Sequence, residues 1–100
     1  MLPRWWNLPA VGRLVDTILM FYTYAISSLN KNYIYVGLTS NLERRLSEHN
    51  KGYNKTTKPY KPFNLIYFES FSTRIEARKK EKYLKSGIGK GFLKNFINDT

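Results

Sequence analysis

The pattern of hydrophobic and polar positions predicts three β-strands. Residues 21–28 are aromatic, aliphatic or hydroxyl-bearing, which is typical of a strand. Residues 33–38 predict a second strand, and the polar residues 29–32 supply turn chemistry, so the two strands are expected to pair as a hairpin. Residues 63–71 predict a third strand.

A first helix is predicted between the second and third strands. Ser40 is followed three residues later by Glu43, which matches the capping box that opens many helices. This helix is expected to end near Gly52, because glycine is the preferred residue just past a helix C-terminus. Residues 52–62 are polar and basic with two prolines, which indicates a loop.

A second and a third helix are predicted after the last strand. Thr73 and Glu76 repeat the capping-box pattern and open a helix that runs to about Ser86. Three glycines then interrupt the helical pattern: Gly87, Gly89 and Gly91. A short final helix is expected at about 90–97.

The order strand, strand, helix, strand, helix, helix predicts an α/β fold. More closely, we expect an α+β sandwich in which helices flank a small three-stranded antiparallel sheet. The patterned segment 20–98 is interpreted as one domain. Residues 1–19 have no clear period, and we interpret them as an N-terminal extension from a misassigned start, with Met20 as the natural start; a genuine arm packed by Trp5 and Trp6 is the alternative.

The charge of the chain indicates a polyanionic partner. Seventeen basic and seven acidic residues give a net charge of +10, an excess that favours nucleic acid first and an anionic membrane surface second. A basic helix with the broad apolar face of a membrane-surface domain is not evident, and no apolar run is long enough to span a bilayer. The absence of cysteine favours a reducing cytoplasm.

Helix geometry separates one arginine of the first predicted helix from its neighbour. At about 100° per residue, Leu42, Leu46 and His49 fall on one side of the helix. Arg45 lies on the flank of that side, four residues from His49, whereas Arg44 points away. Arg45 is therefore a candidate for function, and Arg44 is interpreted as a solvated charge.

The second predicted helix carries a carboxylate on its apolar face. One stripe contains Ala77, Glu81, Leu84 and Ile88. A carboxylate on a buried face is costly unless it is paired or bound to a metal. Glu81 is therefore either a metal ligand or a partner of Arg78 or Lys85, and the spacing alone leaves both open. Glu76 lies roughly opposite and is expected to pair with Lys80.

Two short motifs, Tyr22-Thr23-Tyr24 and Tyr35-Val36-Gly37, resemble the half-motifs of the GIY-YIG nuclease superfamily. Arg45, His49 and Glu81 fall in register with the arginine, histidine and glutamate of that family. The resemblance extends over residues 21–97 and is closest to the short, single-domain bacterial branch, which resembles the N-terminal domain of the excision-repair nuclease.

The sequence departs from the family pattern in three places. Tyr22 and Thr23 replace the glycine and isoleucine of the first half-motif. Leu38 stands where some members have a lysine near the phosphate, which puts that contact in doubt. Asn95 is a loose match to an asparagine near the end of many members.

The resemblance implies a metal-dependent endonuclease that hydrolyses DNA phosphodiester bonds with Mg²⁺ or Mn²⁺. Glu81 would be the only protein ligand of the metal, whose other positions hold water and phosphate oxygens. Arg45 would brace the phosphate. Tyr24 or Tyr35 would help to deprotonate the attacking water, and His49 would hold that tyrosine or shuttle its proton.

Eight basic residues are expected to form a DNA-facing rim: Lys55, Lys58, Lys61, Arg74, Lys79, Lys82, Lys90 and Lys94. Such contacts go mainly to phosphates, so cutting is expected to be structure-specific or low in sequence specificity, in DNA repair or processing. The expected substrate is DNA, branched or single-stranded forms included, with RNA left open. The chain is expected to act as a monomer. The alternative is a nucleic-acid-binding module of the same fold that cuts slowly or not at all.

Overall fold

The computed structural model describes residues 20–98, so the interpretation of residues 1–19 lies outside the described part of the chain. The elements follow the predicted order. They are β1 (Phe21–Ser28), β2 (Ile34–Thr39), α2 (Leu42–Lys51), the 3₁₀ helix η3 (Lys58–Tyr60), β3 (Phe63–Phe71), α3 (Arg74–Lys85) and α4 (Gly87–Asn98). No helix of residues 20–98 is long and apolar enough to cross a membrane.

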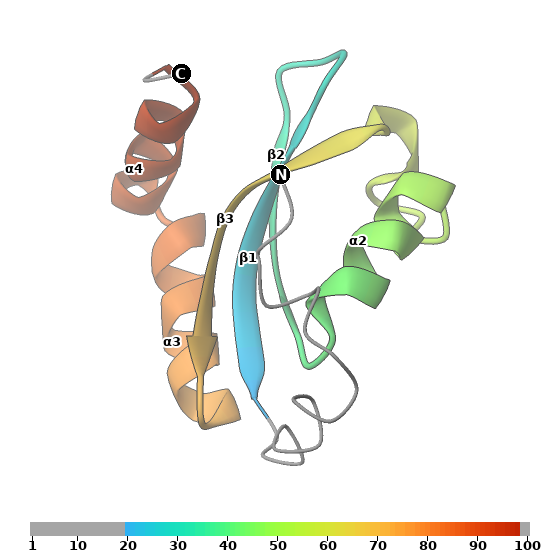
Figure 1. Ribbon diagram of the computed structural model, residues 1–100. Coiled ribbons are helices and arrows are strands. Elements are labelled where there is room, and N and C mark those ends of the chain that lie inside the picture. The colour runs from blue at the N-terminus through green and yellow to red at the C-terminus, as the bar shows by residue number, and fades with distance from the viewer. Residues whose placement is uncertain (1–19, 99–100) are drawn as a thin grey trace.

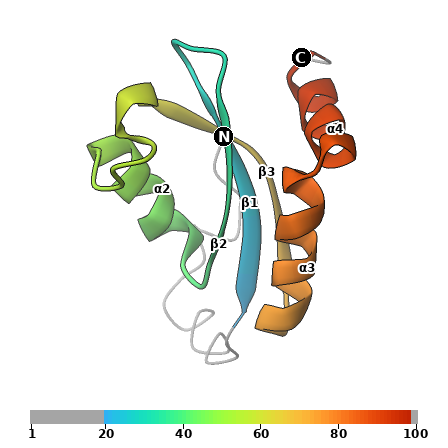
Figure 2. The same ribbon diagram turned by 180° about the vertical axis from the view of Figure 1, so that it is seen from behind.

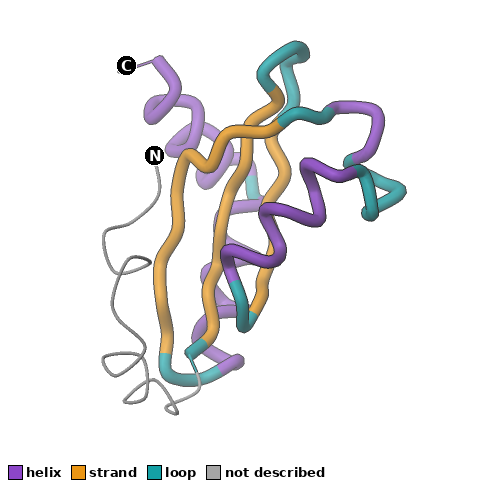
Figure 3. Tube along the Cα trace, turned by 45° about the vertical axis from the view of Figure 1, so that its right-hand side comes forward, coloured by secondary structure: helices purple, strands orange, loops and turns teal. Residues whose placement is uncertain are grey.

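The three strands form an antiparallel sheet in the order β2-β1-β3, with helices on both faces. Helix α2 covers one face and helices α3 and α4 cover the other (Figure 1), and the same layers are seen from behind in Figure 2. Figure 3 shows the strands side by side, with α2 crossing in front of them. The predicted sandwich of a three-stranded antiparallel sheet flanked by helices is therefore confirmed.

Strand β1 is buried on both sides because its side chains alternate between the two layers. One core cluster contains Tyr24, Ile26, Leu42 and Phe63, on the α2 side. The other contains Ala25, Val36, Leu84 and Leu93, on the side of α3 and α4. The central strand thus supplies consecutive residues to two cores, which fixes which face each of its side chains presents.

The helix starts differ from the sequence predictions in two places. Helix α2 is capped by Asn41 and not by Ser40: the Asn41 side chain accepts a hydrogen bond from the Arg44 backbone N–H at 3.1 Å. Asparagine is as good an N-cap as serine. Helix α4 begins at Gly87, about three residues earlier than predicted, because the Ser86 side chain accepts from the Gly89 N–H at 3.2 Å and starts a new helix there.

Two predicted side-chain placements also differ. Ile88 does not extend the buried stripe of α3; it lies in α4 and is 77% exposed. Glu76 does not pair with Lys80, since its carboxylate accepts from the Thr73 hydroxyl at 2.9 Å. Lys80 pairs with Glu69 of β3 instead, at 3.6 Å. The turn between α3 and α4 explains the first difference, because the helical period does not continue through it.

Candidate active site

The phenol of Tyr24 lies directly across the backbone of Gly37. The two residues are partners in the β1–β2 register, and a Cβ atom at position 37 would stand 2.5 Å from the Tyr24 hydroxyl oxygen. Any side chain there would displace the ring, so glycine is required for this close approach. Because β2 is an edge strand, the arrangement brings the Tyr24 hydroxyl to the rim of the sheet.

At this rim lies a pocket of about 200 Å³ that gathers polar side chains from four elements. Four of the five residues predicted to form the site line it, from β1, β2, α2 and α3: Tyr24, Tyr35, Arg45 and Glu81. Arg74, predicted for the basic rim, and Arg78 line it as well. Residues that are distant in the sequence therefore meet in one small cationic pocket with a single carboxylate.

The fifth predicted residue, His49, lies behind the pocket and contacts Tyr24. Its Nε2 is 2.8 Å from the Tyr24 hydroxyl oxygen, and its Nδ1 is 2.8 Å from the hydroxyl oxygen of Thr57. His49 and Thr57 are 0% exposed and Tyr24 is 1% exposed. The three side chains form a buried hydrogen-bonded chain that leads from the pocket into the protein.

Thr57 has no counterpart among the residues singled out from the sequence. It lies between α2 and η3, and the Asn54 side chain accepts hydrogen bonds from the backbone N–H groups of Thr56 and Thr57, at 2.9 and 3.2 Å. Asparagine often organises turns in this way. Asn54 was thus the available signal for an ordered turn, but nothing in the sequence indicated that Thr57 would meet His49.

Burial controls the protonation of His49. It lowers the pKa of His49 to about 4, and the nearby Arg45 guanidinium lowers it further. His49 is therefore neutral at physiological pH. In the tautomer with the proton on Nδ1, this N–H donates to the Thr57 hydroxyl and Nε2 accepts from the Tyr24 hydroxyl.

The pKa of His49 predicts how the stability of the fold depends on pH. Below pH 6.5 the unfolded chain binds a proton at His49 that the folded chain does not bind, so the free energy of unfolding decreases as the pH falls. We expect a decrease of about 2 kcal/mol between pH 7.5 and pH 5, measured by urea denaturation. His49 is the only histidine, so His49→Gln should remove most of this dependence. An unchanged slope in that variant would contradict the prediction.

Tyr24 is a protonated phenol under physiological conditions. Burial raises the pKa of Tyr24 to about 12, although the Arg45 guanidinium opposes part of this rise. Arg45 also donates to Glu48 at 3.1 Å, and its side chain is 34% exposed against 66% for Arg44. The separation of Arg45 from Arg44 by helix geometry is borne out by this placement.

Glu81 combines both alternatives that the sequence left open. Its carboxylate lines the pocket and is 8% exposed, and it also pairs with Lys85 at 3.1 Å and Arg78 at 3.5 Å. No cluster of three or more acidic, histidine or cysteine side chains occurs within residues 20–98. Mg²⁺ often takes one or two carboxylates and completes its shell with water and phosphate oxygens. A single carboxylate facing a phosphate-sized pocket fits such an ion, which would have to displace at least one of these cations.

The predicted basic rim is divided by the structure into separate surfaces. Arg74 lies in the pocket, and Lys90 and Lys94 line a neighbouring cleft. Lys79 and Lys82 are exposed on α3 but turn away from the pocket, since they lie about 160° and 100° around the helix from Glu81. Three further lysines are exposed in the segment that follows α2: Lys55, Lys58 and Lys61. Asn95 is exposed on α4 and is not among the residues that line the pocket.

A three-stranded sheet with two tyrosines, an arginine and a glutamate at its open rim defines a class of catalytic domain. The family model described as the GIY-YIG catalytic domain matches residues 20–94. The chain belongs to this family. Tyr24, Tyr35 and Gly37 are the positions at which its two half-motifs meet in the structure.

Two relatives and one solved structure illustrate the similarity. A UPF0213 protein of Clostridium perfringens is 39% identical over 67 residues, which cover 66% of this chain and 71% of that protein. A UPF0213 protein of Listeria welshimeri is 41% identical over 63 residues, covering 62% and 70%. The solution NMR structure of a UPF0213 protein from Bacillus halodurans is 28% identical, with a TM-score of 0.48 and coverage of 77% and 84%.

Proposed function

We propose that the chain is an endonuclease that hydrolyses DNA phosphodiester bonds with the help of one divalent cation, Mg²⁺ or Mn²⁺. The observation that carries the proposal is the pocket itself, in which Tyr24, Tyr35, Arg45 and Glu81 converge at the edge of the sheet. Membership of the GIY-YIG catalytic domain family supports it. The net charge of +10 supports a polyanionic substrate.

The roles of the charged residues follow from their chemistry. Arg45 presents a fork of donors that suits the oxygens of a phosphate and stabilises negative charge as it develops. Glu81 holds the divalent ion, which supplies positive charge against the leaving oxygen. Arg74 and Arg78, in the same pocket, add to the attraction for phosphate. These contacts are made to the backbone of the nucleic acid, so low sequence specificity is part of the proposal.

The proton of the attacking water is proposed to leave through Tyr24. Its phenol is neutral and cannot act as a phenolate at physiological pH, but its oxygen can accept a proton while its own proton passes to Nε2 of His49 at 2.8 Å. His49 can accept that proton because it is neutral, and the Thr57 hydroxyl stabilises the imidazolium side by accepting from Nδ1. Tyr35 has no comparable buried acceptor among its described contacts; its ring centroid lies 5.0 Å from that of His49. We therefore assign the base to Tyr24 in preference to Tyr35.

A second candidate function is a nucleic-acid-binding module that does not cut. The observation that favours it is the pairing of both Glu81 oxygens with Arg78 and Lys85. If these pairs persist in the presence of divalent ions, the carboxylate is not available to a metal. The pocket and the charge would then still bind phosphates.

The two functions are distinguished by incubating the purified protein with supercoiled plasmid. We expect conversion to nicked circles with Mg²⁺ or Mn²⁺, and none with EDTA, because the single carboxylate alone provides too little positive charge for the leaving oxygen. Restoration by added Mn²⁺ after EDTA treatment is the control for irreversible damage. Binding of plasmid, branched DNA and RNA without cutting under every metal condition would favour the binding module.

A further inference from the structure

A second cleft, of about 530 Å³, runs along the outer edge of β2 beside the candidate active site. One wall is the strand itself and the other is formed by the end of α3 and the start of α4. Tyr35 lines both this cleft and the pocket of Glu81, and Lys85 joins them because it lines the cleft and pairs with Glu81. The two hollows are therefore continuous along one edge of the sheet.

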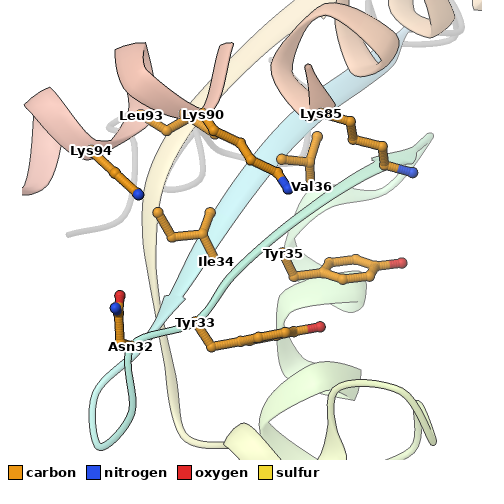
Figure 4. Close-up of a pocket in the computed structure, with 9 residues that line it drawn as sticks. All are labelled: Asn32, Tyr33, Ile34, Tyr35, Val36, Lys85, Lys90, Leu93 and Lys94. Carbon is orange, nitrogen blue, oxygen red and sulfur yellow. The ribbon is translucent and has the colours of Figure 1, made fainter. Parts of the chain in front are cut away.

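The cleft has a basic wall and an apolar floor. Figure 4 shows Lys90 and Lys94 extending from α4 toward Ile34 and Val36, while the rings of Tyr33 and Tyr35 project from β2 away from these lysines. Lys90 and Lys94 are four residues apart and share one face of α4. Neither is paired with a carboxylate of residues 20–98.

The exposed backbone of β2 adds hydrogen-bonding groups to the same surface. The Tyr33 carbonyl accepts from the Ser28 N–H at 2.9 Å, so residues 33, 35 and 37 direct their backbone groups toward β1. The alternate residues Ile34 and Val36 therefore direct theirs outward, into the cleft. An outward N–H group between two ammonium groups is a suitable donor to an anion.

Lysines beside an open strand can also serve only to discourage pairing with another strand. The continuity of the cleft with the catalytic pocket is not explained by that role. No acidic side chain lines the cleft, so a polyanion fits it better than a neutral peptide strand. Regularly spaced positive charges over an apolar floor are the features that bind a single strand of nucleic acid, which offers phosphates and the flat faces of its bases.

We propose that this cleft holds the DNA strand that flanks the cut, with phosphates on Lys90 and Lys94 and sugar or base faces on Ile34 and Leu93. The inference rests on the proposed function, because it takes the pocket of Glu81 as the place where the strand is cut. It replaces the diffuse basic rim expected from the sequence with one path along the edge of β2.

The test compares two double variants that remove the same charge: Lys90→Ala with Lys94→Ala in the cleft, and Lys79→Ala with Lys82→Ala on the outer side of α3. Binding of a fluorescein-labelled single-stranded oligonucleotide is measured by anisotropy in EDTA, over a series of salt concentrations. We expect the cleft variant to lose about tenfold in affinity, and its plot of log affinity against log salt to flatten by about 1.4, or about 0.7 for each phosphate contact. The α3 variant should lose clearly less.

Equal losses in the two variants, or a larger loss in the α3 variant, would overturn the cleft and favour a diffuse electrostatic rim. Circular dichroism melts establish that both variants are folded. Since the binding is measured without metal, its outcome is separate from cutting. Plasmid nicking with no cleft effect would refute the cleft and keep the nuclease, whereas a cleft effect without nicking would refute the nuclease and keep the strand-binding cleft.

Discussion

Replacing Glu81 with glutamine is expected to reduce metal-dependent cutting on the order of 10³-fold. The amide keeps the shape of the side chain but loses the charge that would hold a divalent ion in a pocket with no other carboxylate. Plasmid nicking under a titration of Mn²⁺ is the measurement. The loss should persist at saturating Mn²⁺, since a neutral amide is a poor ligand for such an ion.

The stability of this variant distinguishes a metal ligand from a structural ion pair. Arg78 and Lys85 are 64% and 54% exposed, so both can return to water when Glu81 loses its charge. The cost to the free energy of unfolding is therefore expected to be about 1 kcal/mol or less. Glu76→Gln, on the same helix but exposed, is the matched control and should cut normally. Undiminished cutting by Glu81→Gln, with reduced stability, would show that the carboxylate is only an ion-pair partner.

Much of the fold follows from local patterns in the sequence. The strands and helices occur in the predicted order, and Gly52 ends α2 in the left-handed conformation that glycine adopts readily, at a φ of 80°. Helix periodicity also separated Glu81 from Glu76 before any tertiary contact was known. These predictions succeeded because each depends on residues within one or two turns of helix.

What the sequence did not reveal depends on contacts between distant segments. The hydrophobic pattern of β2 does not indicate that it lies at the edge of the sheet, so the cleft beside it could not be foreseen. The position of Thr57 behind His49 depends on how the segment after α2 folds back. Lys85, expected only as a partner of Glu81, also connects the two hollows, and this requires the turn between α3 and α4.

The assignment of the general base predicts different effects for the two tyrosines. Tyr24→Phe is expected to slow cutting by about 10²–10⁴-fold, the range for loss of a general base, because no proton can then pass from the attacking water toward His49. Tyr35→Phe should cost less, since Tyr35 is not joined to the buried chain of hydrogen bonds. Rates are measured on one oligonucleotide substrate with saturating metal. A larger loss in Tyr35→Phe would move the role of base to Tyr35.

A double variant tests whether Tyr24 and His49 act as one relay. If the phenol proton passes to Nε2 of His49, then His49→Gln and Tyr24→Phe each interrupt the same path, and the double variant should be little slower than Tyr24→Phe alone. Tyr24→Phe also leaves a buried nitrogen without its partner, at a cost of about 1–3 kcal/mol in the free energy of unfolding. Rates are therefore compared well below the melting temperature of the least stable variant. Fully additive losses would mean that His49 only positions the ring of Tyr24 and that the proton leaves by another route.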